Sequence, residues 1–162
     1  MCTFVSSLYM ILVLLLSFGT ATPAFASGGG GGGWPAPPQY VETDFDRASQ
    51  AINARDYDRA ITYLNAVVAR NERDADAHNL LGYSERMRGN LDAAFKHYER
   101  ALAIDPKHRG AHEYVGETYL LAGNLPKAEE HLAILDKLCF FPCSEYSDLK
   151  AAVAAYKAKH PH

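Results

Sequence analysis

The apolar residues after position 40 are spaced as in amphipathic helices, at i, i+3 and i+7, and their arrangement recurs every 34 residues. A shift of this length brings three blocks into register, at residues 41–74, 75–108 and 109–142. In each block positions 8 and 20 are small, and positions 17, 24 and 27 are apolar and mostly larger. These residues are Ala48, Gly82 and Gly116; Ala60, Ala94 and Ala128; Tyr57, Leu91 and Leu125; Leu64, Tyr98 and Leu132; and Val67, Ala101 and Leu135.

Each block predicts two antiparallel helices joined by a tight turn. The residues before position 17 are Arg55-Asp56, Gly89-Asn90 and Gly123-Asn124, and such residues are typical of the end of one helix and the start of another. Small residues at positions 8 and 20 let the two helices approach closely. No single pair can bury its apolar side, so we expect the pairs to stack around one elongated core.

The middle block resembles the tetratricopeptide repeat. Six of its residues stand where that family expects them: Leu81, Gly82, Ala94, Tyr98, Ala101 and Pro106. The third block follows the pattern through Leu135, whereas the first departs from it at Arg47, where an apolar residue is usual. The resemblance implies an all-α fold over residues 43–142, in which three antiparallel helix pairs form a right-handed superhelical stack.

The residues after the third block predict one further helix, over 144–160, that caps the stack. Tyr146, Leu149, Val153 and Tyr156 form an apolar stripe at i, i+3, i+7 and i+10. Three lysines are expected to keep the opposite side in water, namely Lys150, Lys157 and Lys159. An open stack of repeats needs such a helix, with one apolar and one polar face.

Residues 1–26 have the pattern of a secretory signal peptide. Leu8 to Phe18 is uncharged, apolar and too short to cross a bilayer, and Ala24-Phe25-Ala26 fits a signal-peptidase site. We expect cleavage after Ala26, no stable membrane insertion afterwards, and export to a bacterial periplasm. Secretion is the alternative. Met1 to Ser7 lacks the lysine or arginine that is usual in a signal peptide, so an uncleaved amino-terminal anchor stays open as a less favoured interpretation.

Residues 27–42 predict a disordered Gly/Pro-rich linker. Six consecutive glycines, Gly28 to Gly33, precede a segment with three prolines, and neither part can bury enough surface to offset its ordering entropy. The segment from Trp34 to Tyr40 could instead be a short ligand for an aromatic-lined groove.

The composition argues against several classes of function. A formal net charge of −3 gives no basic field for nucleic acid. The sequence has no glycine-rich phosphate loop before a helix, no serine in a strand-to-helix elbow, and no H-E-x-x-H motif. We therefore expect no catalytic residues, no cofactor and no enzymatic activity.

Cys139 and Cys143 form the local motif with the most specific chemical implication. In an exported protein we expect a disulfide between them, with Phe140 and Phe141 packed beneath it and Pro142 ending the preceding helix. Two thiolates at this spacing could instead bind a soft ion such as Cu(I), completed by His131, or by His160 and His162. Free buried thiols are a third possibility. The metal or thiol-redox interpretation gives the alternative function, a metal-handling or redox accessory protein.

The other histidines argue against a metal site. His78 and His112 share position 4 of their blocks, and His97 and His131 share position 23. Equivalent positions in stacked repeats are about one repeat apart, too far for one ion to join them. The resemblance makes position 4 a packing site, so His78 and His112 are expected to replace an aromatic ring there.

The resemblance also implies where a partner would bind, because the first helix of each pair lines the concave groove in this family. The residues that would line it are Phe45, Ser49, Asn53, Asn79, Tyr83, Arg86, Met87, Glu113, Glu117 and Leu120. The lysine and asparagine ring with which relatives clamp a chaperone's carboxylate is missing. We therefore expect a non-catalytic interaction module of the bacterial cell envelope that binds a peptide or helix, with self-association through the stack ends as a further possibility.

Overall fold

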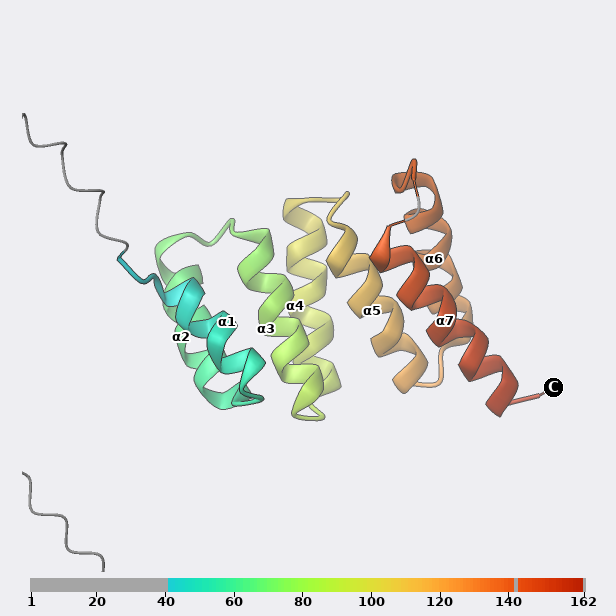
Figure 1. The fold of residues 1–162 in the computed structure, drawn as a ribbon, viewed down its shortest axis with the longest axis horizontal. Coiled ribbons are helices and arrows are strands. Elements are labelled where there is room, and N and C mark those ends of the chain that lie inside the picture. Colours follow the sequence, from blue (N-terminus) through green and yellow to red (C-terminus); the bar gives the residue numbers. More distant parts are fainter. Residues whose placement is uncertain (1–40, 142, 162) are drawn as a thin grey trace, which may run out of the picture. The chain divides into compact units, whose positions relative to one another are not determined.

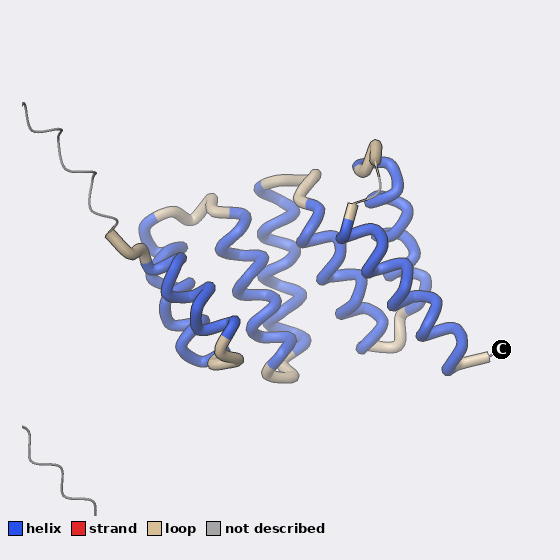
Figure 2. The backbone as a smooth tube through the Cα atoms, viewed as in Figure 1, coloured by secondary structure: helices blue, strands red, loops and turns tan. Residues whose placement is uncertain are grey.

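The computed structural model describes residues 41–141 and 143–161. Within these residues the chain forms seven α-helices and no strand (Figures 1 and 2). The helices are α1 (Asp44–Asn53), α2 (Tyr57–Arg70), α3 (Ala75–Met87), α4 (Leu91–Ile104), α5 (Arg109–Leu121), α6 (Leu125–Leu138) and α7 (Ser144–Lys159). The predicted signal peptide and the linker up to residue 40 lie outside the described residues. None of the helices at residues 41–141 and 143–161 is long and apolar enough to cross a membrane.

The helices pack as three antiparallel pairs in two layers. Helices α1, α3, α5 and α7 form one layer, and α2, α4 and α6 form the other (Figure 1). Within the first layer α3 contacts α5, and α5 contacts α7. This arrangement confirms the all-α stack of helix pairs with a C-terminal helix that the sequence predicts.

Side chains that accept hydrogen bonds from backbone N–H groups fix most of the helix starts. Thr43 and Asp46 form a capping box at α1, in which the backbone N–H of each donates to the other's side chain. Asp or Asn side chains cap α2, α3, α4 and α6 in the same way. At α5 the ring of His108 takes this role, because its Nδ1 accepts from the N–H of Ala111 at 3.1 Å.

The turn inside each pair needs one residue in the left-handed region. Gly89 and Gly123 have φ angles of 83° and 76°, and Arg55 occupies the equivalent position in the first pair with φ of 59°. Glycine adopts this conformation without steric cost, whereas arginine does not. The turn therefore has the same geometry in all three pairs, but the first pair forms it with a disfavoured residue.

The core follows the repeat positions. The alanines at position 20 (Ala60, Ala94 and Ala128) have no exposed surface, and neither do Leu64, Tyr98 and Leu135. At Gly82 a Cβ atom would lie 2.5 Å from Cε1 of Tyr98, so the close approach of α3 and α4 depends on the absence of a side chain. The expectation of close helix approach at position 8 is thus confirmed for the middle pair.

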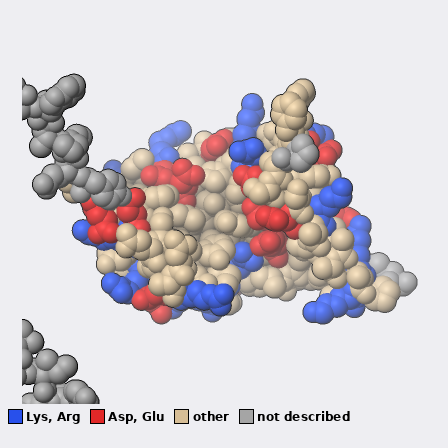
Figure 3. Space-filling model, in the orientation of Figure 1, with Lys and Arg blue, Asp and Glu red and all other residues tan. Residues whose placement is uncertain are grey.

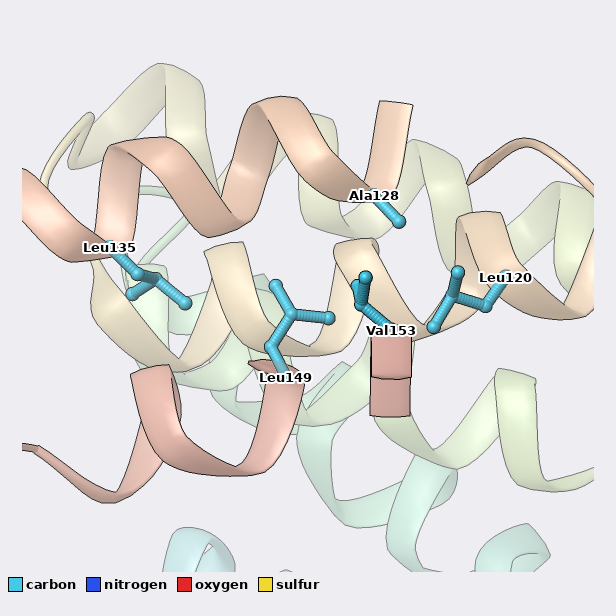
Figure 4. Close-up of a cluster of buried hydrophobic side chains, with 5 residues drawn as sticks. All are labelled: Leu120, Ala128, Leu135, Leu149 and Val153. Carbon is cyan, nitrogen blue, oxygen red and sulfur yellow. The ribbon is translucent and has the colours of Figure 1, made fainter. Parts of the chain in front are cut away.

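Helix α7 closes the end of the stack through the predicted apolar stripe. Leu149 and Val153 are buried against Leu120 of α5 and against Ala128 and Leu135 of α6 (Figure 4). Gly116 contributes here, since a Cβ atom on it would lie 2.6 Å from Cδ2 of Leu149. Position 8 of the third pair therefore accommodates α7, and not a residue of its own pair.

Candidate functional site

The residues that the resemblance places in the groove lie on α1, α3 and α5, which we call the inner-helix face. Tyr83 and Met87 come from α3, and Glu113 and Glu117 come from α5. Met87 is 44% exposed, and the other three are partly exposed. The structure brings the α3 and α5 members together, while Ser49 and Asn53 lie on α1, one helix pair away.

An arginine joins two tyrosines and a glutamate at the centre of this face. The guanidinium of Arg86 lies 5.3 Å from the ring centre of Tyr83 and 5.6 Å from that of Tyr114. The two ring centres are 5.1 Å apart. Nη1 of Arg86 also forms an ion pair of 3.0 Å with Oε2 of Glu117. Because the Arg86 side chain is only 12% exposed, we assign it to holding these groups in place, and the rings to presenting the contact surface.

The α5 side of this face is acidic. Figure 3 shows acidic side chains gathered over the region of α5, next to a surface without charged groups. Burial and, after it, the charges of Glu117, Asp148 and Glu145 together raise the pKa of Glu113 to about 7. Among the described residues Glu113 has no ion-pair partner, and the charge of Arg86 offsets the effect of burial and of the neighbouring acids only in part.

Tyr83 is held in its position by a second aromatic neighbour. Its ring packs edge-on against that of Tyr57, with ring centres 6.2 Å apart. Burial raises the pKa of Tyr83, and the neighbouring phenol of Tyr57 raises it as well. The phenol of Tyr83 therefore stays protonated at neutral pH and can donate a hydrogen bond. A ligand at this face would meet rigid aromatic rings that carry polar ends, a combination enriched at protein interfaces.

The structure corrects two of the proposed contact residues. Leu120 is 9% exposed and belongs to the core beneath α7, and Asn79 is 6% exposed. Leu120 is buried because α7 covers this end of α5, which the positions within a single repeat do not reveal. Of the α1 residues, Phe45 packs against the core of the first pair, and the Ser49 hydroxyl donates to the Phe45 carbonyl oxygen at 2.9 Å.

Two aromatic residues that contact Tyr83 were not among the predicted groove residues. Tyr114 stands at position 6 of the third block, and Tyr57 begins the second helix of the first pair. Both contact Tyr83, which was predicted. Tyr114 could have been found from the repeat pattern. The first helices of neighbouring repeats contact one another, so position 6 of one block can lie against position 9 of the preceding block.

The two cysteines are joined by a disulfide, with their Cα atoms 5.9 Å apart. A disulfide has no thiolate to offer a metal ion, and the described residues contain no group of three or more metal-binding side chains. The expectation that Phe140 and Phe141 pack beneath the bridge is wrong, because they are 92% and 76% exposed. Their rings contact each other, with centres 5.0 Å apart.

The histidines of positions 4 and 23 pair within the second repeat and within the third. His78 stacks on His97 with ring centres 5.9 Å apart, and His112 lies 5.2 Å from His131. His112 is 5% exposed, which fits the expected packing role of position 4. The sequence comparison related His78 to His112 by repeat position, but it did not reveal that positions 4 and 23 face each other across one helix pair.

Solved structures of similar fold contain proteins bound to peptides. They include the Yersinia enterocolitica type III secretion chaperone SycD in complex with a peptide of the translocator YopD, which is 21% identical over 72% of this chain and 91% of that chain, with a TM-score of 0.63. PcrH with the chaperone binding region of PopD is 19% identical over 72% and 90%, with a TM-score of 0.64. The second TPR domain of human RPAP3, in complex with an HSP70 peptide, is 17% identical over 68% and 92%, with a TM-score of 0.61. At these identities the likeness shows the fold.

Two sequence models of the tetratricopeptide repeat match this chain, one at residues 45–109 and the other at residues 86–153. A search of the curated proteins finds no significant match. The two matches together span all seven helices except the ends of α1 and α7, and the helix pairs in the structure recur with the same period as the sequence blocks. The chain belongs to the tetratricopeptide repeat family.

Proposed function

We propose that this protein is a non-catalytic interaction module of the bacterial cell envelope, and that it binds an extended peptide or a helix of a partner protein across the inner-helix face. The proposal is based mainly on one cluster of side chains, in which Arg86 contacts the rings of Tyr83 and Tyr114 and forms an ion pair with Glu117. This cluster combines fixed aromatic surface with acidic and phenolic groups. The peptide complexes of SycD, PcrH and RPAP3 support this use of the fold.

The charges of the face indicate the chemistry of the bound segment. Glu113 lacks an ion-pair partner among the described residues, and burial followed by the repulsion of three further carboxylates raises its pKa. A lysine or arginine on the ligand would relieve this repulsion, and an apolar residue next to it would pack on Tyr83 and Tyr114. We therefore expect a partner segment in which a basic side chain neighbours an apolar one.

A cell-envelope location is supported by two features. The apolar stretch from Leu8 to Phe18 and the Ala24-Phe25-Ala26 site predict export. The disulfide between Cys139 and Cys143 is a bond that persists in oxidising compartments. If the proposal holds, protein recovered from the envelope fraction begins at Ser27. Recovery of the chain from the cytoplasm with its first 26 residues attached would contradict it.

Site-specific crosslinking tests the binding face. A photo-crosslinking amino acid at the exposed Met87 of α3 should capture a partner in the native envelope, whereas the same group at the exposed Lys96 of α4 should not. A peptide taken from the captured protein should then bind the wild type about tenfold or more tightly than it binds a Tyr83→Ala variant. Equal capture at both positions would refute the assignment, and so would unchanged affinity in the variant.

The control for Tyr83→Ala is Ile134→Ala, which removes a partly exposed apolar side chain from α6, a helix of the other layer. Both variants should retain their helix content by circular dichroism. A loss of binding in Ile134→Ala equal to that in Tyr83→Ala would mean that general destabilisation, and not the inner-helix face, explains the result.

A further inference from the structure

The disulfide loop after α6 holds two phenylalanine rings in solvent. Phe140 and Phe141 are 92% and 76% exposed, and the bond from Cys139 to Cys143 closes the loop that carries them. A flexible loop could turn such rings back onto the protein surface. A short loop closed by a disulfide has few conformations in which the rings could fold back. The rings therefore remain exposed and can contact another molecule.

An apolar pocket lies directly beside these rings. It has a volume of about 640 Å³ and is lined by the two phenylalanines, by Asp136 of α6, and by Tyr146, Lys150, Ala151 and Ala154 of α7. We call these residues the C-terminal patch. The lysines expected on the outward side of α7 are exposed, but exposed alanines lie between them and make part of this side apolar: Ala151, Ala154, Ala155 and Ala158.

The patch is complementary to itself. It has a projecting pair of aromatic rings and, beside them, an apolar pocket that such rings could enter. In a two-fold interface the same surface of both copies must supply both parts of the contact. Its charges show the same property. Asp136 and Lys150 have opposite signs and neither is in an ion pair with another described residue, although the Lys150 ammonium lies 5.4 Å from the Tyr146 ring centre.

We propose that the C-terminal patch is the interface at which two copies of this chain associate about a two-fold axis. The Phe140 and Phe141 rings of each copy enter the pocket of the other, and Asp136 of each copy pairs with Lys150 of the other. The balanced charge argues for a second copy over an anionic lipid surface or a strongly charged peptide, since neither of those would complement both signs. None of these residues belongs to the inner-helix face, so this proposal and the proposed function can fail separately.

Sedimentation equilibrium of the chain as recovered from cells tests the proposal. The wild type should show a concentration-dependent monomer–dimer equilibrium. Phe140→Ser combined with Phe141→Ser should weaken it about tenfold or more, whereas the matched control Leu121→Ser, which changes an exposed leucine outside the patch, should not. A wild type that stays monomeric at every concentration overturns the proposal, and so does a dimer that the double variant leaves unchanged.

Charge reversal tests the two-fold geometry independently. Asp136→Lys and Lys150→Asp should each weaken the dimer, and the two together should restore it, because the reversed charges then face each other again. Ala154→Arg, which fills the pocket without touching the loop, should also abolish the dimer. The arrangement is overturned if the combined reversal does not restore association. The choice of partner is overturned if the chain is monomeric in solution and binds neutral phosphatidylcholine vesicles.

Discussion

Nδ1 of His131 lies 2.9 Å from Nδ1 of His112, and Nε2 of His112 lies 3.0 Å from the carbonyl oxygen of Pro106. A carbonyl oxygen can only accept, so Nε2 of His112 carries the proton. In the neutral ring Nδ1 of His112 then accepts the hydrogen bond that Nδ1–H of His131 donates. This pairing joins α5 to α6, and it needs the ring of His112 to be uncharged, because a protonated Nδ1 could not accept.

The histidine pair predicts a loss of stability in acid. Burial, followed by the charge of His112, lowers the pKa of His131 from 6.5 to about 4. Because the folded state binds its proton less readily than the unfolded state, this contribution is complete above pH 6.5 and is lost as the pH falls towards 4. The expected loss in the free energy of unfolding is at most about 3 kcal/mol.

Urea unfolding at a series of pH values checks this prediction with a variant. In His131→Gln the amide can still donate to Nδ1 of His112 but takes up no proton, so the acid-dependent loss should be much reduced. The control is His160→Gln, which changes an exposed histidine at the end of α7 and should leave the wild-type profile. An unaltered profile in His131→Gln would assign the acid sensitivity to other groups.

Glu113 has the opposite pH dependence. Its pKa of about 7, raised mainly by burial, lies above the ordinary value of 4.5, so the folded state binds the proton more tightly than the unfolded state. The contribution of this group to stability is greatest below pH 4.5 and is lost as the pH rises through 7. Glu113→Gln should therefore stabilise the protein by about 1 to 2 kcal/mol at pH 8, a range reduced because the carboxylate is partly solvated, and should have little effect at pH 4.

Thermal unfolding at the two pH values measures the Glu113 effect. Glu99→Gln on α4 is the matched control, since Glu99 is exposed and its change should stay within about 0.5 kcal/mol at either pH. Equal effects of Glu113→Gln at pH 4 and pH 8 would show that the carboxylate is not destabilised by its surroundings.

The left-handed position of the turns predicts opposite effects of two substitutions. Arg55→Gly should stabilise the protein by about 0.5 to 1 kcal/mol, because glycine adopts the φ of 59° without the steric cost that arginine has. Gly89→Ala should destabilise it by about 1 kcal/mol for the same reason. No atom lies within 4 Å of a Cβ built at Gly89, so only the backbone conformation is tested. Melting temperatures that move in the same direction for both variants would refute this account.

The contact between Gly116 and Leu149 predicts that α7 packs against α5 only if residue 116 has no side chain. Gly116→Ala should destabilise the protein by about 1 to 3 kcal/mol, because its Cβ would lie 2.6 Å from Cδ2 of a fully buried leucine. Leu149→Val in the same chain should recover part of this loss by withdrawing the atoms that collide. Hydrogen exchange along α7 measures the effect, and additive destabilisation in the double variant would show that the two residues do not interact.

The sequence predicted the helix pairs and the C-terminal helix because their signals are local. Helical spacing and turn residues depend on residues close along the chain, and Ala60, Ala94 and Ala128 show that the same local pattern recurs in each block. The pairing of His112 with His131 and the contact of Gly116 with Leu149 depend instead on the register between helices, which the repeat positions do not specify.

The candidate site was predicted less completely than the fold. Tyr83, Arg86 and Glu117 were identified by position, and the structure brings them together. Leu120 was misassigned because α7 covers it. Phe140 and Phe141 were misassigned, because they are exposed and line a pocket beside the disulfide loop while Leu135 and Leu149 form the buried core at this end.

The ion pair between Arg86 and Glu117 has a consequence for the entropy of binding. It links α3 to α5 before any ligand is present, and the same guanidinium holds the rings of Tyr83 and Tyr114. Side chains that are already immobilised lose little rotational freedom when a partner arrives, so the ordering cost of association falls mainly on the ligand. Between related ligands, the one that is most rigid in its unbound state should therefore gain most from this surface.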